Sequence, residues 1–74
     1  MSPEELAAKL KEMYFDSKDG EAAVSIHLFG IKYADQIKES GASPAGIAKL
    51  AGVPDSYATE ISKGCKLARY VVLK

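Results

Sequence analysis

The sequence predicts an all-α fold, a compact domain of four to five helices. Three observations support this prediction: apolar residues recur at helical spacing, a serine–proline pair typical of a helix start occurs twice, and glycines stand where helical stretches end. The 74 residues allow a single domain, residues 1–74, with a small core. Apolar residues make up 47% of the chain, which is enough for a globular fold and argues against a disordered chain.

The first predicted helix spans residues 3–15. Ser2 can accept a hydrogen bond at the helix start, Pro3 suits the first helical position, and Glu5 stands where a capping box places an acid. Apolar residues then follow at helical spacing, at Leu6, Leu10, Met13 and Tyr14. Residues 16–20 are polar and turn-forming, so a loop is expected there.

A central helix is predicted over residues 21–40, a stretch without proline whose apolar residues occupy more than one side. A helix that is apolar nearly all round is typical of a buried position. Gly30 costs about 1 kcal/mol relative to alanine in a helix interior, so it indicates a close helix crossing or a break. Gly41 suits the end of this helix.

Two short helices joined by a tight turn are predicted over residues 43–64. Ser43 and Pro44 form the second helix-start pair, and small apolar residues then give the first of these helices one inner face. Gly52 ends this helix after two turns and supplies the left-handed backbone angle that a tight turn needs. Val53 is expected to fill the corner between the two helices.

The second helix of the pair begins at Pro54 or Asp55 and runs to about Lys63, and Gly64 is expected to stop it. Residues 65–74 carry apolar residues that suit either a helix or a strand. We favour a helix for this last segment.

A helical wheel of the second helix separates its side chains into two faces. Ala58 and Ile61 point toward the first helix, with Tyr57 at the boundary. The side chains that point outward are all polar, namely Asp55, Ser56, Thr59 and Lys63. The second helix of a helix-turn-helix has such an outward face, and the major groove of DNA admits an α-helix. The domain is therefore expected to contain a helix-turn-helix over residues 43–64.

Residues 41–64 resemble, without gaps, the core of the Cro and phage-repressor type of helix-turn-helix regulators. The similarity lies in the Ala51-Gly52-Val53 turn, in Ser56-Tyr57, in Glu60-Ile61, in Gly64, and in Ala48 four residues before the turn glycine. The chain as a whole, including residues 28–34, is also similar to small, poorly characterised bacterial helix-turn-helix-like proteins.

The resemblance implies a DNA-binding protein, a small transcriptional regulator that reads the major groove with the helix over residues 55–63. It implies base contacts from Ser56, Thr59, Glu60 and Lys63, and phosphate contacts from Tyr57 and Ser43. Lysine and arginine side chains outside this set, at Lys49, Lys66, Arg69 and Lys74, are either further phosphate contacts or solvated surface charges. The expected DNA-binding set is Ser43, Lys49, Asp55, Ser56, Tyr57, Thr59, Glu60, Lys63 and Lys66.

The charge distribution agrees with a phosphate-binding second half. The whole chain has zero net charge, but residues 1–40 carry a net charge of −3 and residues 41–74 a net charge of +3. Double-stranded DNA is therefore the expected partner. A second copy of the chain is the other expected partner, because helix-turn-helix proteins commonly act as dimers on paired half-sites. The apolar surplus of the first two helices is the expected dimer face.

Catalysis is not expected. The chain lacks a nucleophile–base set, a glycine loop for phosphate and a metal-ligand cluster, and no cofactor is implied. His27 has Ala23 and Ile31 one turn away rather than a carboxylate, so a structural histidine is expected. The single cysteine, Cys65, cannot form an internal disulfide, which indicates a reducing compartment. With no export signal and no membrane-length apolar segment, a cytoplasmic location is expected.

An alternative interpretation is a protein–protein interaction or assembly module that keeps the helix-turn-helix shape without binding DNA. The zero net charge supports it. Two departures from the Cro-type pattern support it as well: Pro44 stands where a glutamine is common, and the acidic Asp55 stands where a basic or neutral polar residue is usual.

Overall fold

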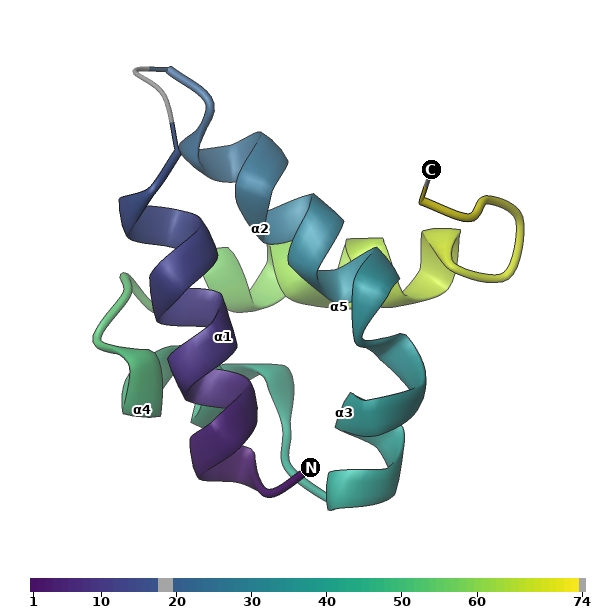
Figure 1. Cartoon of the computed structure of the whole chain (residues 1–74), viewed down its shortest axis with the longest axis horizontal. Coiled ribbons are helices and arrows are strands. Elements are labelled where there is room, and N and C mark those ends of the chain that lie inside the picture. The colour runs from purple at the N-terminus through teal and green to yellow at the C-terminus, as the bar shows by residue number, and fades with distance from the viewer. Residues whose placement is uncertain (18–19, 74) are drawn as a thin grey trace.

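The computed structural model describes residues 1–17 and 20–73, and its helices confirm an all-α fold. Five helices lie in these ranges, in the order α1 (Pro3–Phe15), α2 (Ala22–Lys32), α3 (Ala34–Ser40), α4 (Pro44–Ala51) and α5 (Tyr57–Leu67). Figure 1 shows α1 and α2 running in opposite directions on the near side of the molecule, with α5 crossing behind them. The most extensive helix contacts are those of α2 with α5 and of α1 with α4.

Both predicted serine–proline helix starts are confirmed. At α1 the Ser2 hydroxyl accepts from the Glu5 backbone N–H at 3.1 Å, and the Glu5 carboxylate accepts from the Ser2 backbone N–H at 3.0 Å. The hydrogen bond from the Ser2 backbone N–H contributes most to lowering the pKa of the Glu5 carboxyl, and the Ser2 hydroxyl lowers this pKa further. At α4 the Ser43 hydroxyl accepts from the Gly46 N–H at 3.0 Å. Of the loop predicted after α1, residues 18–19 lie outside the described ranges.

The single central helix expected over residues 21–40 is wrong, because the chain bends at Tyr33 and forms α2 and α3 instead. Tyr33 has φ −112° and ψ 19°, outside the helical region, and its ring packs at 5.3 Å on that of Phe29. The bend turns α3 back toward α1 and lets Ile37 enter the core, which a straight helix held along α5 does not allow. Gly41, at φ 75°, ends α3 as predicted.

α2 is also less buried than its composition predicts. Its inner face, with Ile26, Phe29 and Gly30, is buried, but Val24 is 52% exposed and Leu28 is 37% exposed. The helix therefore covers the core with one face and leaves apolar side chains on the other.

α2 and α5 cross at Gly30 and Gly64. A Cβ atom on Gly30 would lie 2.5 Å from the Ile61 carbonyl oxygen and 3.0 Å from the Gly64 Cα atom. A Cβ atom on Gly64 would collide with the His27 carbonyl. The close crossing predicted for Gly30 is thereby confirmed. The expected stop at Gly64 is wrong, because Gly64 lies inside α5 and lets the two backbones touch.

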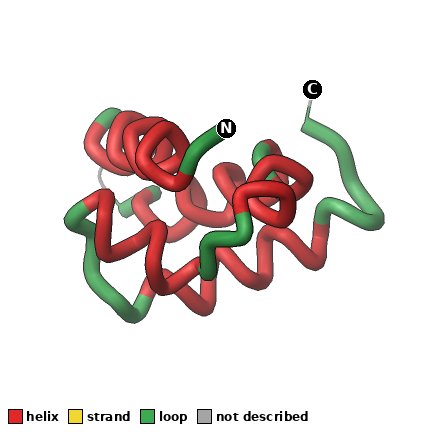
Figure 2. Tube along the Cα trace, turned by 90° about the horizontal axis from the view of Figure 1, so that it is seen from below, coloured by secondary structure: helices red, strands yellow, loops and turns green. Residues whose placement is uncertain are grey.

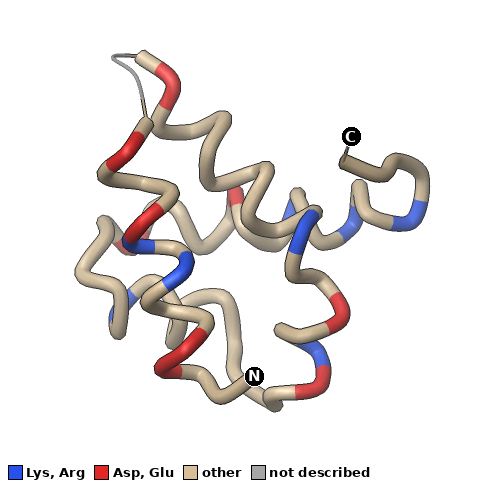
Figure 3. Tube along the Cα trace, in the orientation of Figure 1, with Lys and Arg blue, Asp and Glu red and all other residues tan. Residues whose placement is uncertain are grey.

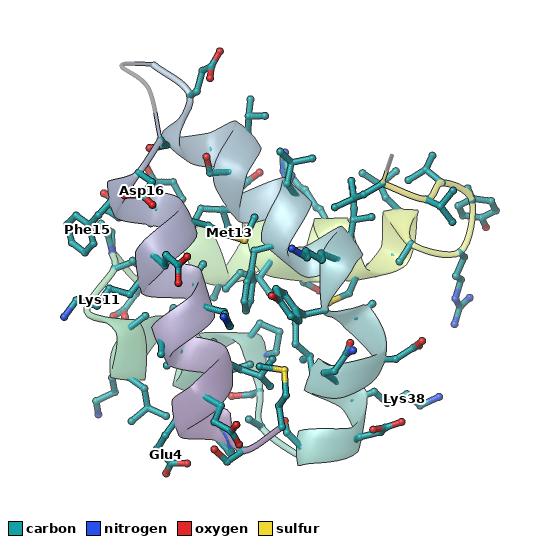
Figure 4. The ribbon with its side chains drawn as sticks, in the orientation of Figure 1. Glu4, Lys11, Met13, Phe15, Asp16 and Lys38 are labelled. Carbon is teal, nitrogen blue, oxygen red and sulfur yellow. The ribbon has the colours of Figure 1, made fainter. Side chains whose placement is uncertain are left out.

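One hydrophobic cluster joins the helices. Its fully buried large side chains are Phe29, Leu6, Leu10, Ile26, Ile47 and Ile61. At its edge Met13 lies between α1 and α2, whereas Lys11 and Glu4 point away from the body of the molecule (Figure 4). α1 thus covers α4 while α2 covers α5, so the first two helices form a support for the last two.

The helix favoured for residues 65–74 is only partly correct. α5 continues to Leu67, but residues 68–70 form a turn and residues 71–73 have no regular structure. The turn begins where the Ala68 and Tyr70 N–H groups donate to the Gly64 and Leu67 carbonyls. The apolar side chains from Tyr70 to Leu73 stay exposed, although residues 71–73 line a pocket together with Ile31 of α2 and Ala34 of α3. Within the described residues, the helices are too short or too polar to cross a membrane.

Candidate nucleic-acid interface

The corner between α4 and α5 is built as the sequence predicts. Gly52 has φ 74° and ψ 21°, the left-handed conformation, and its N–H donates to the Lys49 carbonyl at 3.2 Å. The Val53 N–H donates to the Ala48 carbonyl at 3.1 Å, so the last free carbonyls of α4 are satisfied in a Schellman arrangement. Val53 is buried in the core cluster, where it holds the corner closed.

α5 begins two residues later than expected. The Tyr57 and Ala58 N–H groups donate to the Pro54 and Asp55 carbonyls, each at 3.0 Å, in a tight turn that leads into the helix. Asp55 and Ser56 therefore lie in this turn rather than in the helix, and both are exposed.

One face of α5 is free of the core and polar. Thr59, Lys63 and Lys66 follow one another at spacings of four and three residues and are all exposed. Ile61 and Gly64 lie buried on the opposite side. Figure 2 shows α5 running along one edge of the molecule, with the other helices on one side of it only. We call the exposed polar residues of this face and of the turn before it the outer face, namely Asp55, Ser56, Thr59, Lys63 and Lys66.

Tyr57 differs from these residues because it is half-buried. Its ring lies 5.6 Å from that of Tyr14 in an edge-to-face arrangement, so it fastens the start of α5 to α1. Its predicted place at the boundary between the inner and outer faces is confirmed.

The two predicted contact residues that precede the corner lie at opposite ends of α4. Ser43 is exposed at its start, and Lys49 is exposed in its last turn. The Ser43 hydroxyl already accepts a hydrogen bond from Gly46, but its own hydrogen remains available to donate to a phosphate oxygen. The Ser43 hydroxyl and the Lys49 ammonium group are therefore both accessible, one at each end of α4.

Glu60 is drawn toward the body of the protein. One carboxylate oxygen, Oε2, contacts Nε2 of His27 on α2, and the other, Oε1, lies 3.5 Å from Nζ of Lys63. The Glu60 side chain is 24% exposed and that of Lys63 is 60% exposed. The sequence alone does not reveal this contact, because His27 and Glu60 are remote in the chain and meet only at the crossing of α2 and α5.

Charges are unevenly placed over the fold. Figure 3 shows acidic positions on α1, at the start of α2 and on α3, whereas basic positions follow one another along the C-terminal half of α5 and beyond it. In the described part of α5 and its C-terminal turn, the basic residues are Lys63, Lys66 and Arg69. Lys74 lies outside the described residues. The positive end of the molecule therefore coincides with the end of the outer face.

Cys65 lies on the inner side of α5, half-buried against the core. Burial raises the pKa of its thiol, which disfavours the reactive thiolate. Among residues 1–17 and 20–73, His, Cys, Asp and Glu side chains form no group of three that could hold a metal ion.

Comparison with known proteins gives one match. Residues 2–74 match the family described as HTH-like domain, where HTH stands for helix-turn-helix. No curated protein and no solved structure is significantly similar to the chain.

Proposed function

The chain belongs to the HTH-like domain family, and we propose that it binds double-stranded DNA with α5 in the major groove, as a small cytoplasmic transcriptional regulator. It acts by binding and not by catalysis. The observation that carries the proposal is the outer face, where exposed hydroxyls and two lysines line up, although Leu67 beside them is 44% exposed. The resemblance of residues 41–64 to Cro-type regulators supports it.

The proposed contacts divide into two groups. Base edges are read from Ser56, Thr59 and Lys63, since hydroxyls and ammonium groups find partners in the major groove, and the resemblance to Cro-type regulators adds Glu60 to this group. Phosphates are held by Ser43, Lys49, Tyr57 and Lys66. Asp55 faces the same groove, where its carboxylate can accept only from a base amino group and repels phosphate.

We further propose that two copies bind together. One chain presents one recognition helix, and half-sites of a two-fold operator lie about 34–36 Å apart. The longest dimension of the molecule is 31 Å, so two copies side by side match this spacing. The exposed side of α2, with Val24 and Leu28, is the proposed dimer surface.

A titration of fluorescent duplexes of random sequence, followed by anisotropy at several salt concentrations, tests the proposal. Binding is expected at low salt and should weaken as salt rises. Lys66→Ala is expected to reduce the salt slope by about one unit, because Lys66 is a proposed phosphate contact and each phosphate-neutralising charge contributes roughly that amount. Lys11→Ala, an exposed lysine on α1, is the matched control and should leave the slope unchanged. The proposal fails when the wild-type chain binds no duplex at low salt.

A second candidate is the interaction or assembly module. It is favoured by the apolar side chains that remain exposed on α2 and along residues 70–73. Replacing Thr59 and Lys63 together by alanine separates the two functions. A DNA-binding protein loses duplex binding, whereas a module that uses α2 keeps its self-association in sedimentation.

A further inference from the structure

We infer that Glu60 positions Lys63 and does not read a base. The inference rests on the proposed DNA binding and narrows it, because it removes one residue from the base-reading set and makes that residue a restraint on its neighbour. The carboxylate of Glu60 then lowers the affinity of the outer face for DNA.

The first support is that both oxygens of the Glu60 carboxylate already have neighbours. Oε2 contacts Nε2 of His27, and Oε1 faces Nζ of Lys63 at 3.5 Å. Reading a cytosine amino group needs a carboxylate oxygen that is free at the surface of the helix. The Glu60 side chain is largely covered, so its acceptor positions are turned to protein groups.

The second support is the cost of moving Glu60 outward. His27 Nε2 is shielded from solvent, and Glu60 is its polar neighbour. Swinging the carboxylate toward DNA takes away the polar neighbour of that ring nitrogen. The contact sits at the tight α2–α5 crossing, where the His27 backbone touches Gly64, so α2 cannot shift to follow.

The third support is the effect on Lys63. Its ammonium group lies on the outer face but is paired with a carboxylate three residues earlier on the same helix. That carboxylate offsets the lysine charge, and it also repels the phosphates that Lys63 approaches. Losing the negative charge of Glu60 therefore strengthens the attraction of α5 for DNA of any sequence.

Glu60→Gln tests the inference against a charge-matched control, Glu12→Gln, an exposed acid on α1. Both changes raise the net charge by one. With random-sequence duplexes at low salt, Glu60→Gln is expected to tighten binding roughly twofold to fivefold over Glu12→Gln, the range for releasing one partly exposed ion pair. The sequences that the two variants select from a random duplex pool should be the same.

Lys63→Ala in both backgrounds supplies a second measurement. Its cost to binding should be larger in the Glu60→Gln protein than in the wild type, because Lys63 is then free of the carboxylate. Circular dichroism confirms that each variant is folded. Glu60→Asp, which keeps the charge, covers the case in which glutamine unfolds the chain, and it is expected to bind like the wild type.

The outcomes separate the two levels of the proposal. When the wild type binds DNA but Glu60→Gln binds no tighter than Glu12→Gln, or selects a different base at one position, the positioning role of Glu60 is overturned and DNA binding stands. When the wild type itself binds no duplex, the proposed function fails and this inference falls with it.

Discussion

The distance between α2 and α5 depends on two residues that have no side chain, Gly30 and Gly64. A Cβ atom added at either position would lie against the backbone of the other helix, and backbone atoms cannot move aside as a side chain can. Glycine lowers helix stability by about 1 kcal/mol relative to alanine, so both positions trade helix propensity for close packing. The crossing in turn brings His27 into contact with Glu60. The close approach of the two backbones therefore determines where Glu60 lies in the candidate interface.

Gly64→Ala is expected to lower the free energy of unfolding by about 1–3 kcal/mol despite the better helix propensity of alanine, because the added methyl group overpacks the crossing. Urea denaturation followed by circular dichroism measures this. Gly46→Ala on α4 is the control, where the new methyl group meets only the Ser43 hydroxyl. An unchanged midpoint for Gly64→Ala would contradict the close contact between the two backbones.

The Cys65 thiol should react slowly with an alkylating reagent in the native protein. Burial raises its pKa, so the thiolate fraction at about pH 8 is smaller than in the unfolded chain. The same shift stabilises the fold below the unfolded pKa and loses this contribution as pH rises through the folded one. Rates of iodoacetamide labelling with and without urea check this, and equal rates in both states would show that the thiol is not protected.

At the level of the elements, α4 and its corner are specified by local residues. Ser43 caps the start and Gly52 ends the helix in the left-handed conformation. Eight residues form only two turns, and so short a helix is marginal in water on its own. Its stability therefore comes from these caps and from packing on α1. This packing holds α4 against α5.

Ser43→Ala is expected to destabilise the protein by about 1 kcal/mol, the usual value of a lost N-cap. Ser43→Asp should restore the stability, because aspartate caps a helix as well as serine does. It should nevertheless weaken DNA binding, since it adds a negative charge where a phosphate is proposed to lie. Thermal unfolding and duplex anisotropy measure the two effects; a Ser43→Asp protein as unstable as Ser43→Ala argues against the capping role.

At the scale of the whole molecule, the first two helices form a layer that covers the last two. α1 and α2 bury the helix-turn-helix from one side, and basic residues collect at the far end of α5 (Figure 3). The uncovered apolar side chains of α2 lie on the supporting layer and not on the outer face. These are the two separate surfaces proposed for DNA and for a second copy.

Leu28→Ser is expected to leave the fold intact and to dissociate the proposed dimer, because the side chain is exposed and its removal opens no cavity in the core. Sedimentation should show a monomer, and DNA binding should weaken because the second half-site is lost. Leu50→Ser, an exposed leucine on α4, is the matched control. A Leu28→Ser protein with the same mass in solution as the wild type would exclude α2 as the dimer face.

The amino-acid sequence alone specified the local structure of this protein. The capping box at Ser2, the Ser43 start, the Gly52 corner and the polar outer face all depend on neighbours within one or two helical turns, and the sequence predicts all of them. These features are enough to define a helix-turn-helix and most of its candidate contacts. Each depends on backbone hydrogen bonding or helical periodicity, which act between residues close in sequence.

Only the tertiary structure decided the bend at Tyr33, the continuation of α5 through Gly64 and the pairing of Glu60 with His27. Each involves segments remote in the chain: the bend brings Ile37 into the core, α5 continues where its backbone meets α2, and Glu60 contacts His27 where the two helices cross. A glycine that can end a helix can also let two helices touch, and local sequence does not distinguish these roles. The position of the opposing helix does, because it determines whether there is room for a side chain.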